Sequence, residues 1–177
     1  MDITFRAVTR DNFSRVIDMK VAPGQEDFVA SNLYSIAEAS LEPSWMPLAI
    51  QAGEELVGFA MFGRDDSTGQ WWIMRYMIDA AHQSKGYGTA ALSGLLDLMV
   101  ERHGCREVFL DYASGNEIAG RLYARAGFVP TREEAGAIEV RLDLTGRGSI
   151  QDPGDDRLRP ETLPTDAPSP QHPAADE

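Results

Sequence analysis

The stretch at residues 77–92, MIDAAHQSKGYGTAAL, joins a β-rich segment to a helical pattern through a glycine-rich turn. Such a turn brings free backbone N–H groups and a helix N-terminus to one point, which suits an anion such as a pyrophosphate. Gly86 and Gly88 allow the backbone to come close, Lys85 adds a positive charge, and Thr89 offers a hydroxyl or a cap. The alternative interpretation is a tight strand-to-helix turn without a ligand.

Two other glycine motifs are excluded on different grounds. The turn lacks the Gly-Lys-Ser/Thr ending of a P-loop. A dinucleotide fingerprint tolerates alanine at its third glycine, and Ala91 stands at that spacing, so spacing alone does not exclude it. The neighbouring elements exclude the dinucleotide fingerprint, because it belongs to a repeated βαβ pattern, whereas an antiparallel meander is predicted before this turn.

Hydrophobic periodicity predicts the elements around the turn. We expect Thr9 to cap the first helix and Leu33 to lie on the apolar face of the second. In chain order the prediction is a strand at 3–8, helices at 9–19 and 25–41, strands at 46–52, 56–63 and 70–79, the helix after the turn, a strand at 105–112, a helix at 116–126, and strands from 128 and at 137–144. This order predicts an α/β fold of the α+β kind, with a mixed sheet and helices on both faces.

Composition divides the 177 residues into two parts. Residues 145–177 are rich in Pro and Asp and carry seven acids and three bases, so they are predicted to be a disordered tail. Residues 1–144 are predicted to be one domain and keep a net charge of −8 out of −12. This acidity argues against nucleic acid as a partner and favours cationic partners. The alternative is that the acidity only keeps the protein soluble.

The cellular setting follows from what the chain lacks. No apolar run approaches the roughly 20 residues that cross a bilayer. The N-terminus, MDITFRAVTR, has no signal-peptide pattern, and one cysteine cannot form an internal disulfide. A cytoplasmic protein without membrane contact is expected. No metal is expected, because His82, His103 and His172 do not have metal-ligand spacing.

A second cluster follows at residues 116–128, NEIAGRLYARAGF. Asn116, Ala119 and Tyr123 are spaced i, i+3 and i+7 and share one helical face, along which a rod-like ligand can lie. The turn QSKGYG after a strand, followed by N-x-x-A-x-x-L-Y-x-x-x-G-F, resembles the GNAT acetyltransferase superfamily. The resemblance covers residues 3–144 and implies a single GNAT-like domain, mostly antiparallel, whose sheet is splayed by a bulge at its central strand.

The resemblance also implies acetyl-CoA as co-substrate and assigns roles to residues. In that superfamily the turn holds the CoA pyrophosphate, the preceding strand binds pantetheine and the acetyl carbonyl, the Asn contacts the cofactor arm, and the Tyr protonates the departing thiolate. The implied catalytic residue is Tyr123; the alternative is a core tyrosine with its hydroxyl bonded to backbone. The implied cofactor-binding residues are Met77, Ile78, Gln83, Ser84, Lys85, Gly86, Tyr87, Gly88, Thr89 and Asn116.

The acceptor is expected to be an amine, which must lose a proton before it attacks. At neutral pH this costs about 4 to 5 kcal/mol for an amine of pKa about 10.4, and carboxylates are the favoured proton acceptors and cation anchors. Superfamily acceptors sit between the first two helices and the centre of the sheet. The predicted substrate-binding residues are Tyr34, Glu38, Glu42, Trp45 and Tyr76. The first three recur at i, i+4 and i+8, which is also the pattern of a solvated helical face.

The segments LVGFAMFG and RYMIDAAHQSKGYG are similar to bacterial spermine/spermidine acetyltransferases. The predicted function is therefore transfer of an acetyl group from acetyl-CoA to a primary amine of a small cationic substrate, a polyamine, by direct attack with Tyr123 as general acid. An aminoglycoside, a protein or peptide amine, and a non-catalytic CoA-binding module are the alternatives. Because many superfamily members dimerise through their last strands, a homodimer is an alternative to a monomer.

Overall fold

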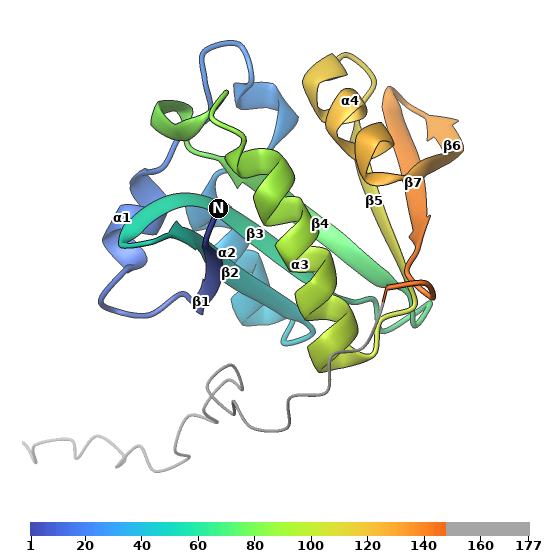
Figure 1. Cartoon of the computed structure of the whole chain (residues 1–177), viewed down its shortest axis with the longest axis horizontal. Coiled ribbons are helices and arrows are strands. Elements are labelled where there is room, and N and C mark those ends of the chain that lie inside the picture. The colour runs from blue at the N-terminus through green and yellow to red at the C-terminus, as the bar shows by residue number, and fades with distance from the viewer. Residues whose placement is uncertain (148–177) are drawn as a thin grey trace, which may run out of the picture.

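A seven-stranded sheet with the strand order β1-β2-β3-β4-β5-β7-β6 forms the centre of the molecule (Figure 1). The computed structural model describes residues 1–147. All strand pairs are antiparallel except β4 and β5, which run parallel. The elements are β1 (Ile3–Ala7), α1 (Phe13–Asp18), η1 (Glu26–Phe28), α2 (Asn32–Leu41), β2 (Trp45–Ala52), β3 (Glu55–Arg64), β4 (Trp71–Ile78), η2 (Ala80–His82), α3 (Tyr87–His103), β5 (Glu107–Ala113), α4 (Glu117–Ala126), β6 (Val129–Glu134) and β7 (Ala137–Asp143). The predicted fold class and element order are confirmed.

Two hydrophobic clusters cover the two faces of the sheet. On one face α3 inserts the buried side chains of Leu92, Leu95, Leu96 and Met99, and α4 adds Tyr123. On the other face, side chains of α1 and α2 pack against those of β2, β3 and β4. Figure 1 shows α3 crossing in front of the sheet, with α4 over the half of the sheet that contains β5 and β7. The sheet thus separates a face covered by α3 and α4 from a face covered by α1 and α2.

The sheet opens between its two central strands. β4 pairs with β5 only at Trp71 opposite Val108 and at Trp72 opposite Phe109. A β-bulge then places Met74 as an extra residue, because Ile73 faces Phe62 while Arg75 faces Met61. A bulge bends a strand and increases its twist, which directs the rest of β4 away from β5. The splayed central strand is therefore present, and it leaves backbone groups of β4 without a strand partner.

The two N-terminal helices are shorter than predicted. Asn12, not Thr9, precedes α1, because the Asn12 side chain bonds Thr9 N–H at 2.8 Å and Ala7 O at 2.9 Å and holds a turn there. Val29 is extended and divides the second predicted helix into η1 and α2. Ser31 caps α2, and Leu33 is 53% exposed instead of lying on the buried face.

The described residues end just beyond the predicted domain boundary. β7 ends at Asp143, and Arg147 still contacts Asp97 of α3 at 3.3 Å. The predicted tail spans residues 145–177, and its residues 148–177 lie outside the described residues. Within residues 1–147, no helix is both long enough and apolar enough to span a membrane.

Candidate acyl-transfer site

A cavity of about 660 Å³ fills the opening between β4 and β5. Its walls include the 83–89 turn and α4 on one face of the sheet, and the segment between α1 and α2 on the other. The two diverging strands form its sides, from Ile73 to Ile78 of β4 and from Asp111 to Ala113 of β5. The cavity therefore reaches through the sheet, so two ligands can meet in it from opposite faces.

The glycine-rich turn presents a row of unpaired backbone donors. Ser84 and Gly86 have positive φ values of 62° and 86°, which fold the chain tightly before α3 begins at Tyr87. The first helical bond runs from Ala90 N–H to Gly86 O at 3.2 Å. Between Ser84 and Thr89, no backbone N–H has an acceptor within residues 1–147. Free donors beside a helix N-terminus attract an anion, so the geometry agrees with the predicted pyrophosphate site.

Replacing Gly86 with Ala is expected to weaken acetyl-CoA binding. At φ 86° a side chain costs about 1–2 kcal/mol of backbone strain, which the turn relieves by moving its donors. We expect KM for acetyl-CoA to rise roughly tenfold, measured by thiol release. Gly53→Ala is the control, because Gly53 also has positive φ and an open environment but lies in the β2–β3 turn. Equal KM values for the two variants would contradict the assignment.

Side chains of the turn and of β4 fix its position. The Gln83 amide donates to Ile78 O at 3.0 Å and to the Gln25 side-chain oxygen at 2.9 Å. The Tyr76 hydroxyl donates to Gly88 O at 2.6 Å and so joins β4 to the first turn of α3. Gln83 therefore acts on the turn by holding it against the strand, and the Tyr76 hydroxyl is occupied.

Lys85 and Tyr87 do not line the cavity, unlike the other predicted cofactor residues. The Lys85 ammonium donates to Ala81 O at 2.7 Å, and the Tyr87 ring packs edge-on against His82. Both side chains thus support the local turn, and the anion-binding capacity rests on backbone N–H groups.

The backbone of β4 that faces the opening can be assigned from its pairing with β3. Asp79 N–H donates to Val57 O at 2.9 Å, so Asp79 points toward β3. Backbone groups alternate in direction along a strand, which turns Met77 toward β3 and Ile78 and Tyr76 toward the opening. The prediction named Met77 and Ile78; by this parity the backbone of Ile78 and Tyr76 faces the opening, and the backbone of Met77 faces β3. Met77 lines the cavity but directs its backbone toward β3.

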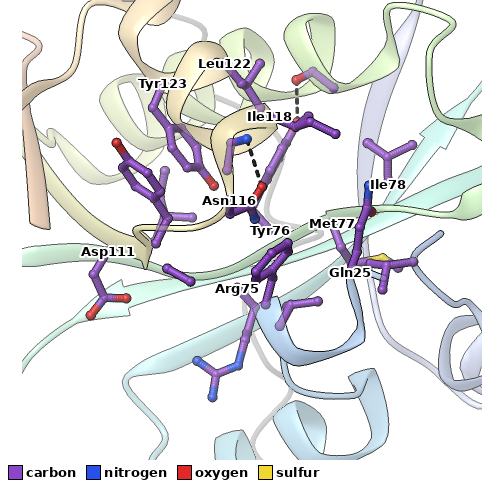
Figure 2. A pocket seen from close by; sticks show the side chains of 18 of the residues that line it. Gln25, Arg75, Tyr76, Met77, Ile78, Asp111, Asn116, Ile118, Leu122 and Tyr123 are labelled. Atoms are coloured by element: carbon purple, nitrogen blue, oxygen red, sulfur yellow. Dashed lines mark hydrogen bonds between the residues drawn. The ribbon is translucent and has the colours of Figure 1, made fainter. Parts of the chain in front are cut away.

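The first turn of α4 presents Asn116 to the cavity. Its side-chain oxygen accepts from Ala119 N–H at 3.1 Å and caps the helix, as Figure 2 shows. The amide nitrogen of Asn116 has no acceptor within the described residues. It is thus available to a carbonyl of an extended ligand that lies along α4.

Tyr123 is buried at the wall of the cavity, with its ring 5.6 Å from that of Tyr112 and 5.7 Å from that of Phe128. Its hydroxyl makes no hydrogen bond within residues 1–147, in contrast to the alternative of a core tyrosine bonded to backbone. Burial raises the pKa of Tyr123 above its ordinary value, and the charge of Asp111 raises it further. The group therefore keeps its proton and can donate it to a developing anion.

The predicted acceptor wall is mostly outside the cavity. None of Tyr34, Glu38, Glu42 and Trp45 lines it. Tyr34 is exposed on α2, and Glu42 follows the end of α2 and accepts from the Trp45 indole at 2.9 Å. The i, i+4 spacing of these residues could not reveal that Tyr34 lies on a polar helical face. It also could not reveal that Glu42 lies in a loop and bonds Trp45.

Glu38 reaches the site only through a neighbour. Its carboxylate lies 3.0 Å from the guanidinium of Arg75, which lines the cavity. The bulge at Met74 explains this contact, because it directs Met74 and Arg75 to the same face, toward α2. The Arg75 Nε is buried and has no hydrogen-bond partner in the described chain. Glu38 thus neutralises a cation that would otherwise face the acceptor side.

Glu38→Gln is expected to destabilise the fold and weaken binding of a cationic acceptor. The two side chains are only 28% and 17% exposed, so the unpaired Arg75 charge costs about 1–2 kcal/mol. Urea denaturation measures this loss, and KM for spermidine should rise. The control is Glu117→Gln, because the Glu117–Arg121 pair is mostly exposed and contributes little. A Glu38 variant as stable as the control would contradict the prediction.

Gln25 and Asp111 are among the cavity residues that sequence reasoning missed. Gln25 lies 58 positions before Gln83, and no local pattern links them. Asp111 occupies the exposed position of a short β-rich segment, where a carboxylate is common. A search for carboxylates on the strand after the glycine-rich helix would have found Asp111, whereas Gln25 had no signal.

The cavity fits the pyrophosphate and the pantetheine arm of a CoA-type molecule. The unpaired N–H groups of the turn suit a pyrophosphate, and the Asn116 amide suits the arm. Arg121 and Arg125 of α4 also line the cavity. Arg125 makes no ion pair or hydrogen bond within residues 1–147, so its charge is available to a phosphate. Among these residues no group of three or more His, Cys, Asp or Glu side chains could hold a metal ion.

Comparisons with known proteins identify relatives of this chain. The model of the acetyltransferase (GNAT) family matches residues 13–128. The spermine/spermidine N(1)-acetyltransferase of Bacillus subtilis is 32% identical over 134 residues, which cover 72% of this chain and 88% of that protein. The mycothiol acetyltransferase of Clavibacter sepedonicus is 34% identical over 93 residues, 52% of this chain and 30% of that protein.

Solved structures share the fold at low sequence identity. The spermidine N-acetyltransferase from Vibrio cholerae, in complex with CoA and spermine, has a TM-score of 0.62 at 16% identity and covers 78% of this chain and 92% of that chain. A putative GNAT acetyltransferase from Desulfovibrio desulfuricans has a TM-score of 0.60 at 18% identity, over 81% of this chain and 99% of that chain. Both similarities concern the fold.

Proposed function

The chain belongs to the acetyltransferase (GNAT) family, and on this premise we propose that it transfers an acetyl group from acetyl-CoA to a primary amine of a polyamine. The observation that carries the proposal is the unbonded Tyr123 hydroxyl at the wall of a cavity that reaches through the sheet. A thioester entering from the α3 and α4 face and an amine entering from the α1 and α2 face can meet there.

The residues of this chain have distinct roles in the proposal. The N–H groups of the 84–89 turn hold the pyrophosphate, and Asn116 holds the arm. The backbone of Tyr76 and Ile78 orients the acetyl carbonyl in the opening. The neutral amine attacks the carbonyl carbon, the carbon–sulfur bond breaks, and Tyr123 gives its proton to the departing sulfur. The proton lost by the amine passes to water, from which Tyr123 is reprotonated.

Two observations support a polyamine as the acceptor. The B. subtilis relative, which is named for spermine and spermidine, matches most of this chain. The net charge of −12 attracts polycations and repels anions. A cytoplasmic setting and a homodimer stay predictions, and gel filtration would measure the second.

The first test is thiol release from acetyl-CoA with spermidine, spermine, an aminoglycoside and a peptide with a free N-terminus. The proposal expects turnover with the two polyamines and the N-acetylated product by mass spectrometry. Turnover with only the aminoglycoside or the peptide would assign a different acceptor. CoA binding without thiol release from any amine would instead indicate a non-catalytic binding module.

A further inference from the structure

We propose that Asp111 binds a second ammonium group of the acceptor, away from the amine that attacks, and thereby favours polyamines over monoamines. The inference rests on the proposed function, and it identifies a residue that makes the enzyme favour polyamines as substrates. Asp111 contributes the only carboxylate to the cavity wall formed by the described residues. Its carboxylate makes no hydrogen bond or ion pair within residues 1–147. An unpaired anion in the wall is therefore open to a cation.

Asp111 lies on the side of the sheet from which the acceptor is expected. Phe109 stacks on Trp72 with ring centroids 5.5 Å apart, and Trp72 packs in the cluster beneath α1 and α2. Side chains two apart on a strand share a face, so Asp111 faces the same side as Phe109. Figure 2 shows Asp111 and Arg75 pointing away from Asn116 and Tyr123. Asp111 is thus placed at the acceptor end, on the opposite face of the sheet from the general acid.

Neighbouring charges leave Asp111 as the anion available for binding. Arg75 is already paired with Glu38 at 3.0 Å, so it does not neutralise Asp111. Glu139 lies directly opposite Asp111 on β7, but its carboxylate accepts from the Thr131 hydroxyl at 2.6 Å and does not line the cavity. Of these two facing carboxylates, only Asp111 therefore lines the cavity without a hydrogen-bond partner in the described residues.

The position of Asp111 fits cation binding better than proton transfer. Its side chain is exposed to solvent and lies on the opposite face from Tyr123. An exposed carboxylate binds an ammonium group weakly, with an effect of about fivefold. The inference therefore predicts a change in KM that depends on a second charge in the substrate, with kcat preserved.

The experiment compares Asp111→Asn with wild type for spermidine, 1,4-diaminobutane and butylamine. Butylamine has the same chain length as the diamine but lacks its second ammonium group. We expect KM for the two polycations to rise about fivefold with kcat unchanged, an effect that shrinks in 1 M salt. KM for butylamine should stay the same. If butylamine is not acetylated, its inhibition constant replaces KM.

Glu139→Gln is the matched control, because it removes the carboxylate that faces Asp111 but does not line the cavity. It should leave KM for 1,4-diaminobutane unchanged. Three outcomes would overturn the inference while the proposed function stands. The first is that Asp111→Asn changes KM equally for butylamine and the diamine, and the second is that Glu139→Gln changes KM as much as Asp111→Asn does. The third is that Asp111→Asn lowers kcat with every amine. Wild-type protein that releases no thiol with any amine would overturn the proposed function and the inference with it.

Discussion

Tyr123→Phe is expected to lower kcat by about 10²- to 10⁴-fold while acetyl-CoA binding stays unchanged. The Tyr123 hydroxyl makes no hydrogen bond in the described chain, so its removal leaves no buried polar partner unsatisfied. The aromatic ring keeps its packing against Tyr112 and Phe128. Stability should therefore be preserved, and the loss should appear in the chemical step, measured by thiol release at saturating substrates.

Tyr112→Phe is the matched control for this prediction. Tyr112 lines the same cavity and its ring lies 5.6 Å from Tyr123, but it belongs to β5 and not to the α4 face that carries Asn116. Its kcat should stay within about twofold of wild type. A large loss in the Tyr112 variant, together with an active Tyr123 variant, would assign the acid to the other hydroxyl.

The pH profile provides a second readout for Tyr123. Burial is the main cause that raises its pKa above the ordinary value of about 10. A raised pKa keeps the phenol in its acid form through neutral pH and up to pH 10. The acceptor amine loses its proton over the alkaline part of this range, so kcat/KM should rise with pH. A fall in kcat below pH 10 that is absent from Tyr123→Phe would contradict the raised pKa.

Gly58→Ala is expected to destabilise the protein by about 3 kcal/mol and to impair acetyl-CoA use. A Cβ at Gly58 would lie 2.4 Å from Met77 O, which is backbone, and 3.0 Å from the Ile78 side chain. Because strand β4 must shift to relieve the contact, Tyr76 and Ile78 would move at the opening. Thermal unfolding should show a midpoint about 10 °C lower, and KM for acetyl-CoA should rise.

The comparison for Gly58 is Gly115→Ala, before α4. A Cβ there meets no atom within 4 Å, and Gly115 does not have positive φ. Its midpoint should stay within about 2 °C of wild type. If Gly58→Ala were as stable as this control, β4 would adapt to the extra methyl group, and the rigid opening would need revision.

Local spacing was sufficient for the parts of the site that lie within one segment. The glycine-rich turn and the Asn116–Tyr123 face are set by neighbours in sequence, so their patterns could be recognised without coordinates. The two N-terminal helices were predicted too long, because the Asn12 side chain and the extended Val29 decide where they begin. Propensity alone does not fix such boundaries.

The sequence by itself determined the fold class, the order of the elements, the glycine-rich turn before α3 and the tyrosine proposed as the acid. The fold class, the order of the elements and the turn follow from periodicity or spacing within short stretches of chain. The role of Tyr123 is what the resemblance to the GNAT superfamily implies. Only the tertiary structure decided that Glu38 pairs with Arg75, that Gln25 bonds Gln83, and that Asp111 lines the cavity. These contacts depend on strand register and on the bulge in β4, which are set by pairing between distant segments.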